Sequence, residues 1–204
     1  MNGIKNILFD LGGVLVDLDR MACVHAFENL GFTNVKDFLG DYGQKGAFKE
    51  LEEGKISKEE FFERIRTHIP QATDTEIAKA FQQFIQGLPV YKLKMLRDLK
   101  RRGYRVMLLS NNNPVVFPYI CEQYFRQEGM TVKDYLDDIY LSYELQLLKP
   151  DTKIFQTLIE RSGINPEETL FIDDSQDNLD VARYLGFETY LAPQNTDFSA
   201  IFNL

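Results

Sequence analysis

The chain has 204 residues, of which 44% are hydrophobic and 13% aromatic, so it can bury a core and is not wholly disordered. Its length suits one domain, or one domain that carries an insertion. The 31 acidic residues outnumber the 23 basic ones and give a formal net charge of −8 at pH 7. An acidic surface repels phosphate backbones, which disfavours a general nucleic-acid binder. A small phosphate ester is not excluded, because a local pocket can oppose the global field.

Cysteine content and hydropathy indicate where the protein works. Cys23 and Cys121 are isolated from each other, without the spacing of a disulfide framework or a metal finger, so we expect buried thiols in a reducing compartment. The apolar run at the N-terminus is too short for a signal peptide, and no stretch approaches the ~18–20 apolar residues of a membrane span. We therefore expect a cytoplasmic protein with no membrane partner.

Short apolar runs alternate with helical patterns over most of the chain. Near-continuous apolar runs, typical of strands buried on both faces of a parallel sheet, occupy residues 4–9, 104–110, 138–142, 169–173 and 188–192. Helical periodicity, ended each time by a glycine, covers residues 91–102, 153–163 and 177–186. Asn165 and Pro166 add the pattern of a helix start. The alternation predicts an α/β fold with a doubly wound, Rossmann-like parallel sheet.

Residues 17–88 interrupt this alternation with helical pattern only. Two capping boxes begin helices there, Ser57 with Glu60 and Thr73 with Glu76. A stretch of this length is too long for one crossover between neighbouring strands. We therefore predict a helical cap over residues 17–88, inserted into a catalytic core made of residues 1–16 and 89–204.

Acidic residues follow two of the predicted strands directly. Asp10 ends the first strand, and Asp173 and Asp174 end the fourth. In a doubly wound sheet the carboxyl ends of the strands form the ligand crevice, so the three carboxylates should meet. Such a cluster repels itself unless a cation neutralises it, and Mg²⁺ prefers oxygen ligands. Single aspartates at turns are common, but three at one crevice indicate a cation site.

Polar residues follow two further strands. Ser110 and Asn111 come after the second strand, where a hydroxyl and an amide could hold phosphate oxygens. Lys149, shortly after the third strand, could offset charge on a transferring phosphoryl group. The Ser-Asn pair alone is a common turn, and the Lys-Pro pair at residues 149–150 alone is a common surface step. The prediction therefore depends on their order and spacing along the chain.

With these residues in place, the sequence resembles the haloacid dehalogenase-like hydrolase superfamily, and within it the helically capped phosphatases. It is most similar there to the sugar-1-phosphate phosphatase-like members, whose first motif also reads Asp-Leu-Gly. The resemblance rests on residues 9–17 (FDLGGVLVD), 108–113 (LLSNNN), 147–151 (LLKPD) and 171–178 (FIDDSQDN), with 51–61 (LEEGKISKEEF) similar to a helix start of the cap. It implies a Mg²⁺-dependent hydrolase of a small phosphorylated metabolite and no nucleic-acid partner. The sequence indicates no oligomeric state.

The resemblance also implies roles for individual residues. Asp10 would be the nucleophile that forms an aspartyl-phosphate. Mg²⁺ would be held by Asp10, Asp174 and the backbone carbonyl of Gly12, with Asp173 as a further ligand, directly or through water. Lys149 would contact both phosphate and nucleophile.

The remaining implied roles concern the substrate and the metal loop. Ser110 would bind the phosphoryl oxygens, and Asn111 belongs to the same substrate-binding turn. Asn178 and Asp177 would order the loop that carries the metal ligands, without contacting the metal themselves.

The first motif departs from the usual phosphatase pattern at Gly12. Most members carry there, two residues after the nucleophile, an aspartate that serves as general acid and base, which is typically worth ~10²–10⁴-fold in rate. Without it, good leaving groups such as an anomeric phosphate would be favoured. Candidate replacements are Glu53, His25 and His68, although structural or solvated histidines are more common.

The departure keeps other members of the family as alternatives. A haloacid dehalogenase uses the same nucleophile on carbon without Mg²⁺, but it does not need paired carboxylates such as Asp173 and Asp174. A phosphonate-cleaving enzyme would need a Schiff-base lysine in the cap. A regulatory module could keep the metal site without turnover, although the presence of Asp10 argues against it. Candidate lysines are Lys45, Lys49, Lys55 and Lys58, and candidate pocket aromatics, which are more often core residues, are Phe27, Tyr42 and Phe48.

Overall fold

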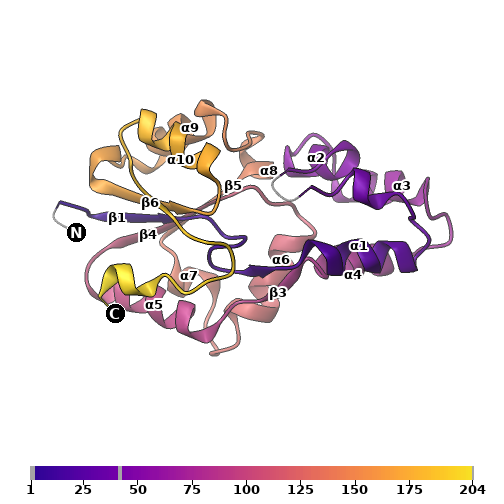
Figure 1. Ribbon diagram of the computed structural model, residues 1–204, viewed down its shortest axis with the longest axis horizontal. Coiled ribbons are helices and arrows are strands. Elements are labelled where there is room, and N and C mark those ends of the chain that lie inside the picture. The colour runs from indigo at the N-terminus through magenta and orange to yellow at the C-terminus, as the bar shows by residue number, and fades with distance from the viewer. Residues whose placement is uncertain (1–2, 41–42, 204) are drawn as a thin grey trace.

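A five-stranded parallel sheet forms the core of the protein in the computed structural model, which describes residues 3–40 and 43–203 (Figure 1). The strands lie in the order β5-β4-β1-β6-β7. Their bounds are β1 Asn6–Phe9, β4 Arg105–Ser110, β5 Asp138–Leu141, β6 Thr169–Asp173 and β7 Glu188–Leu191. The chain builds outward from β1 on one side and then on the other, so the strand order reverses at β1. The predicted fold class is confirmed.

Alternate residues of the strands pack against helices on the two faces of the sheet. Leu8 and Met107 face helices α9 (Thr152–Ser162) and α10 (Gln176–Tyr184), which cover one face in Figure 1. Ile7 and Val106 face the other way, into the cluster that includes helix α5 (Val90–Arg101). Because both faces are covered, the central strands are apolar throughout rather than alternating.

Helix ends follow the signals in the sequence. Both predicted capping boxes form, with Ser57 Oγ accepting from Glu60 N and Thr73 Oγ1 accepting from Glu76 N. Gly163 ends α9 with a φ of 68°, in the left-handed region that glycine tolerates best. The Asn165 side chain does cap a turn, but this is only the 3₁₀ turn Pro166–Glu168, because β6 begins at Thr169.

The described part of the predicted cap region contains four helices, which lie together at the right of Figure 1. These are α1 Arg20–Asn29, α2 Gly46–Glu52, α3 Lys58–Arg66 and α4 Asp74–Gln82, with a 3₁₀ turn at Val35–Asp37. The expectation of helical pattern only was wrong at the two ends of this region. There β2 (Asp17–Leu18) and β3 (Ile85–Gly87) pair antiparallel and connect the helices to the sheet. Strands of two and three residues are too short to show a detectable alternation of apolar and polar residues in the sequence.

Aromatic rings fill the interior of these helices. Phe48 lies in the centre, with edge-on contacts to Phe27, Phe61 and Phe81 at centroid distances of 5.5, 5.1 and 5.1 Å. Phe27 and Phe48 are fully buried, so they are core residues rather than pocket residues. Tyr42, the third aromatic candidate, lies outside the described residues.

The remaining helices connect β4 to β6. They are α6 Val116–Ile120, continued by a π-helical turn at Cys121–Phe125, and then α7 Val132–Tyr135 and α8 Ser142–Leu145. A last 3₁₀ turn covers Ser199–Phe202. The sequence did not predict these elements, because each is too short for helical periodicity. At the far edge of the sheet, β7 is half-exposed rather than buried on both faces, since it has only one neighbouring strand.

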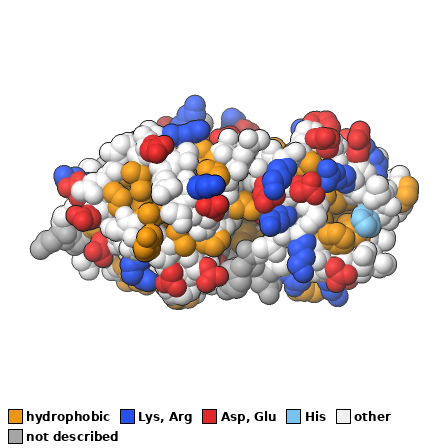
Figure 2. Space-filling view, turned by 90° about the horizontal axis from the view of Figure 1, so that it is seen from above, with side chains coloured by type: hydrophobic (Ala, Val, Ile, Leu, Met, Phe, Trp, Pro, Cys, Tyr) orange, Lys and Arg blue, Asp and Glu red, His pale blue; other side chains and the backbone are white. Residues whose placement is uncertain are grey.

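The described helices include none that is both long and apolar enough to cross a membrane. On the face shown in Figure 2, acidic and basic side chains are interspersed rather than gathered by sign. Cys23 is fully buried as expected, while Cys121 is partly exposed, and both are free thiols.

Replacing Phe48 with alanine should destabilise the protein by about 3–5 kcal/mol, because the surrounding rings cannot close the cavity that it leaves. Urea unfolding at equilibrium measures this loss. The control is Tyr184→Ala, since Tyr184 is 85% exposed and its removal should change the free energy of unfolding by less than about 0.5 kcal/mol. Equal losses in the two variants would contradict a central role for Phe48.

Candidate active site at the strand ends

Three carboxylates meet where β1 and β6 end. Phe9 pairs with Ile172 in the parallel register, so the next residues, Asp10 and Asp173, lie level with each other. A backbone hydrogen bond of 2.9 Å from Asp10 N to the Ile172 carbonyl maintains this alignment. Oxygens of Asp10, Asp173 and Asp174 lie within 4.8 Å of one another. The structure therefore brings together the acids that the sequence singled out.

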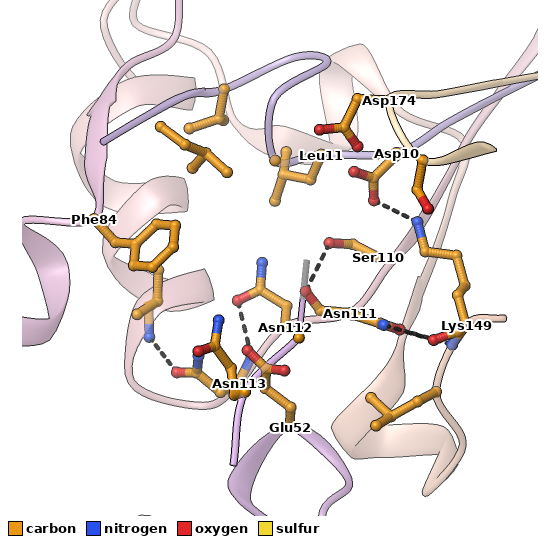
Figure 3. A pocket seen from close by; sticks show the side chains of 18 of the residues that line it. Asp10, Leu11, Glu52, Phe84, Ser110, Asn111, Asn112, Asn113, Lys149 and Asp174 are labelled. Atoms are coloured by element: carbon orange, nitrogen blue, oxygen red, sulfur yellow. Dashed lines mark hydrogen bonds and ion pairs between the residues drawn. The ribbon is translucent and has the colours of Figure 1, made fainter. Parts of the chain in front are cut away.

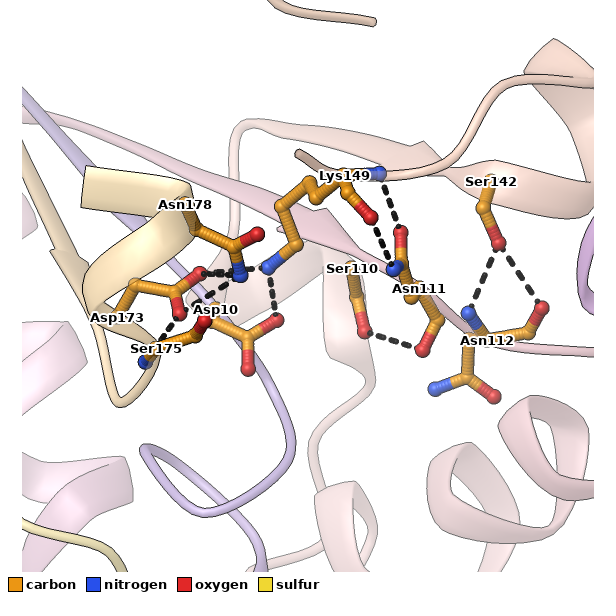
Figure 4. A network of polar contacts seen from close by, with 9 residues as sticks. All are labelled: Asp10, Ser110, Asn111, Asn112, Ser142, Lys149, Asp173, Ser175 and Asn178. Atoms are coloured by element: carbon orange, nitrogen blue, oxygen red, sulfur yellow. Dashed lines mark hydrogen bonds and ion pairs between the residues drawn. The ribbon is translucent and has the colours of Figure 1, made fainter. Parts of the chain in front are cut away.

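Lys149 lies buried between two of these acids. Its Nζ is 2.6 Å from Asp10 Oδ1 and 2.7 Å from Asp173 Oδ2, as Figure 4 shows. The Asn111 side chain holds the Lys149 backbone, donating to its carbonyl at 3.0 Å and accepting from its N–H at 2.9 Å. We predicted the Asn111 amide beside the phosphate, but both of its polar atoms are used in positioning Lys149.

Burial dominates the electrostatics of the cluster. It raises the pKa of Asp10 to about 7, although the charge of Lys149 opposes this shift. Burial and the charge of Asp173 raise the pKa of Asp174 to about 6. Burial alone would lower the pKa of Lys149, but Asp10 and Asp173 raise it above its usual range. The ammonium group therefore stays charged, and the two carboxylates lack part of the positive charge that they need.

Asp173 is fully buried, and both of its oxygens have partners. Oδ1 accepts from Ser175 N at 2.8 Å and from Asn178 Nδ2 at 2.9 Å, while Oδ2 accepts from Lys149. Asn178 thus holds the loop that carries Asp173 and Asp174. Asp177 lies exposed at the rim, and no hydrogen bond of the described residues joins its carboxylate to the loop.

Donors for a phosphoryl group surround Asp10. Ser110 ends β4 and is almost fully buried beside the crevice. Among the described residues, the backbone N–H groups of Leu11, Gly12 and Asn111 donate no hydrogen bond, and all three residues line the crevice. Unused backbone donors next to a hydroxyl and an ammonium group suit an oxyanion with several oxygens.

The backbone after Asp10 leaves little room for side chains. A Cβ atom on Gly12 would lie 2.9 Å from Leu18 Cδ1, so a leucine of β2 occupies the space beside Gly12. Gly13 has a φ of 76°, and a Cβ there would lie 2.5 Å from Asp174 Oδ2. Glycine at position 13 thus allows the loop to approach Asp174 closely.

A crevice of about 380 Å³ extends from these acids to the cap, and Figure 3 shows its lining. Gln44, Lys49 and Glu52 line its cap side with polar groups, and Phe81 and Phe84 add apolar surface. Sequence analysis did not predict these residues as a group. Helical periodicity shows which face of a cap helix is apolar, but not which of its polar residues face the crevice.

None of the three suggested replacements for the missing acid lines this crevice. The carboxylate of Glu53 pairs with Lys55 at 2.8 Å, and the His68 ring stacks on Phe32 at a centroid distance of 4.2 Å. His25 is exposed on α1. These residues are therefore not placed to protonate a leaving group at Asp10.

The donor set at Asp10 and Asp174 fits Mg²⁺. Both carboxylates face the crevice, burial raises the pKa of each, and oxygen is the ligand atom that Mg²⁺ prefers. Gly12 also lines the crevice and can offer its carbonyl oxygen. A divalent cation would neutralise the part of the cluster that Lys149 does not reach.

A carboxylate, an ammonium group and unused backbone N–H donors meet at the switch point of a capped α/β sheet, an arrangement that suits a hydrolase working through a covalent enzyme intermediate. The family model for the haloacid dehalogenase-like hydrolases matches residues 4–186. The chain belongs to this family, which confirms the resemblance seen in the sequence and the expectation of an enzyme.

Relatives support this membership over almost the whole chain. The chain is similar to the D-ribitol-5-phosphate phosphatase of Bacteroides thetaiotaomicron, with 41% identity over 96% of this chain and 95% of the relative. It is also 28% identical to a (S)-2-haloacid dehalogenase of a Pseudomonas species, over 93% of this chain and 82% of that protein.

Solved structures of similar proteins share the fold. A haloacid dehalogenase family enzyme from Bacteroides thetaiotaomicron, in complex with magnesium and inorganic phosphate, superposes with a TM-score of 0.92 at 40% identity, covering 98% of this chain and 99% of that chain. A predicted family hydrolase from Porphyromonas gingivalis has a TM-score of 0.90 at 36% identity, covering 98% and 97%.

Gly13→Ala should weaken Mg²⁺ binding, because the added methyl group displaces Asp174. The left-handed backbone should also cost about 1–2 kcal/mol of stability. Calorimetric titration with Mg²⁺ measures the first effect. The control is Gly103→Ala, whose φ of 87° carries the same backbone strain in open space. Similar Mg²⁺ affinities in the two variants would contradict the contact with Asp174.

Mg²⁺ should raise the Tm more at about pH 8 than at about pH 5.5, because protons on Asp10 and Asp174 compete with the cation. Without the cation, the stability of the protein should instead fall as the pH rises. The folded pKa values of about 7 and about 6 exceed the ordinary value, so the stability contributed by these groups is lost as pH rises through them. Thermal unfolding with Mg²⁺ or EDTA at both pH values tests this. A Tm increase independent of pH would rule out these carboxylates as the ligands.

Proposed function

We propose that this protein hydrolyses a phosphorylated sugar or sugar alcohol through an aspartyl-phosphate on Asp10. It is a Mg²⁺-dependent phosphoric monoester hydrolase. The observation that supports the proposal best is the arrangement of Asp10, Lys149 and Asp174 around one crevice that also presents unused backbone N–H donors. The relatives agree, since one is a ribitol phosphate phosphatase and another was solved with magnesium and phosphate.

Each side chain at the site has a separate role in the reaction. Asp10 attacks phosphorus while the bond from phosphorus to the alcohol oxygen breaks, and water then hydrolyses the aspartyl-phosphate to restore the carboxylate. Lys149 neutralises charge on Asp10 and on the phosphoryl oxygens, with Asp173 and Asn111 holding it in place. Ser110 and the backbone donors receive the remaining phosphoryl oxygens.

Metal binding falls to the two carboxylates of the cluster that line the crevice. Asp10, Asp174 and the Gly12 carbonyl are the proposed ligands, and Asp173 acts by orienting Lys149 and the loop that Asn178 closes. The bound Mg²⁺ supplies charge stabilisation for the transferring phosphoryl group.

The alternatives fit the site less well. A dehalogenase needs no Mg²⁺, so it would leave the further carboxylate of the cluster, Asp174, without a role. Of the four cap lysines that a Schiff base would need, Lys49 lines the crevice, but its side chain is 51% exposed and lies 3.8 Å from Glu53. A Schiff base needs a desolvated amine instead.

Location and partners follow from the same proposal. A small phosphorylated metabolite is the partner, and a cytoplasmic location agrees with free Cys23 and Cys121 in a protein with no disulfide among the described residues.

Asp10→Asn should lower kcat/KM by more than about 10³-fold, since the amide cannot form the acyl phosphate. Thermal unfolding checks that the variant remains folded, because the substitution also removes the ion pair between Asp10 and Lys149. Phosphate release from anomeric sugar phosphates, alditol phosphates and acyl phosphates, with Mg²⁺ or EDTA, is the measurement. The control is Asp180→Asn, which lies exposed on α10. Full activity in Asp10→Asn would remove Asp10 as nucleophile, and no phosphate release by the unaltered protein from any ester would reject the proposed function.

A further inference from the structure

Among the described residues of the cap, one carboxyl group that the phosphoryl chemistry does not use lines the crevice. Glu52 is the last residue of α2 and lines the crevice from the cap side, as Figure 3 shows. Its carboxylate makes no hydrogen bond or ion pair with the described residues. The next residue, Glu53, turns away and pairs with Lys49 and Lys55. Two adjacent acids of the cap thus have different surroundings.

The position of Glu52 is set by the core rather than by the cap alone. Ser142, which follows β5, donates from its Oγ to the Glu52 carbonyl at 2.7 Å. The same Oγ accepts from Asn112 N at 3.0 Å, as drawn in Figure 4. One hydroxyl group therefore joins Glu52 to the loop that carries Ser110.

Close packing of the next cap residues strengthens this connection. Gly54 has a φ of 64°, and a Cβ there would lie 2.1 Å from the Tyr143 carbonyl oxygen. Gln146 Nε2 donates to the Gly54 carbonyl at 3.2 Å. The cap residues 52–54 are thus docked on the core residues 142–146, and the Glu52 side chain is held at the crevice.

Glu52 lies at the opposite end of the crevice from the reacting groups. In Figure 3, Asn112 and Ser110 stand between Glu52 and Asp10. Burial and the neighbouring Glu53 raise the pKa of Glu52 to about 8, and no charge of the Asp10 cluster contributes to this shift. A phosphoryl group at Asp10 would therefore leave the carbon chain of the substrate, not its leaving oxygen, beside Glu52.

The surroundings of Glu52 suit a neutral chain that bears hydroxyl groups. Asn112 uses its amide oxygen to accept from Asn113 N, and its amide nitrogen points into the crevice in Figure 3. Phe81 and Phe84 supply apolar surface for the carbon-bound hydrogens. A protonated carboxyl group both donates and accepts, as a hydroxyl group does, whereas a substrate carboxylate would add negative charge beside a group that already resists ionisation.

We propose that Glu52 is a specificity-determining residue, whose carboxyl group hydrogen-bonds to a hydroxyl group on the carbon chain of a neutral polyol phosphate. Asn112 provides a second polar contact to the same chain. This proposal rests on the proposed function and assigns to Glu52 the selection of alditol and sugar phosphates over phosphorylated carboxylic acids.

The kinetic test compares two esters with the same number of carbons, D-ribitol 5-phosphate and n-pentyl phosphate. Glu52→Leu should lower kcat/KM for the ribitol ester about 10–100-fold and mainly through KM, because a buried site loses its hydrogen-bond partner. The same variant should change kcat/KM for the pentyl ester by less than about threefold. Glu52→Gln, which keeps two polar groups, should fall between the unaltered protein and Glu52→Leu. The matched control is Glu53→Gln, which should leave the ratio between the two esters unchanged.

A binding test separates this inference from the proposed function. Calorimetry on Asp10→Asn, with and without Glu52→Leu, measures the affinity for D-ribitol 5-phosphate and for inorganic phosphate in the presence of Mg²⁺. The additional Glu52→Leu change should weaken binding of the ribitol ester about 10–100-fold and leave inorganic phosphate unaffected. Thermal unfolding shows whether the variants remain folded.

The outcomes are distinct. Equal losses for both esters would assign Glu52 to the chemistry or to folding, and no loss for either would remove it from the substrate contact; each result overturns the inference. If the unaltered protein cleaves neither ester while the binding difference persists, the proposed function fails and the assignment of Glu52 stands.

Discussion

The buried charges at the ends of β1 and β6 constrain the rest of the structure. Asp10, Asp173 and Asp174 bring three potential negative charges to one point, and Lys149 is the ammonium group that contacts two of them. Breaking a buried pair of this kind typically costs about 3–5 kcal/mol, because a charge is left without compensation. Asn111 and Asn178 are therefore committed to holding the pair rather than to the substrate. Lys149 does not neutralise all of the negative charge of the three carboxylates, so the site requires a bound cation.

The same arrangement explains how an acidic protein can accept a phosphate ester. The formal net charge of −8 is a property of the whole surface, whereas the proposed phosphate site offers Lys149, unused backbone N–H groups and the proposed cation. Local positive charge at short range outweighs a distributed negative charge, since salt screens interactions beyond about 10 Å. Ser142 then connects this end of the crevice to the cap, so phosphate binding and recognition of the carbon chain share one hydrogen-bonded loop.

Sequence patterns predicted the sheet and the helix starts because these depend on neighbouring residues. The runs before Asp10 and Asp174 are apolar since both faces of their strands are covered, and the Ser57 and Thr73 caps act within one helical turn. The predictions failed where an element is too short for a period, as in β2 and β3, or where position in the sheet matters, as in β7 at the edge. The roles of individual site residues remain predictions, although Asp10, Asp173 and Lys149 do lie in contact.

The sequence by itself determined the family, the alternation of strands and helices and the carboxylates at the strand ends, because these follow from local periodicity and from motifs in a fixed order. Only the tertiary structure decided that Asn111 holds Lys149, that Leu18 fills the space beside Gly12, and that Glu52 rather than Glu53 faces the crevice. Each of these depends on contacts between segments far apart in the chain. Two adjacent glutamates are equivalent in sequence, and only the docking of the cap on the core separates the one that faces the crevice from the one that pairs with Lys49 and Lys55.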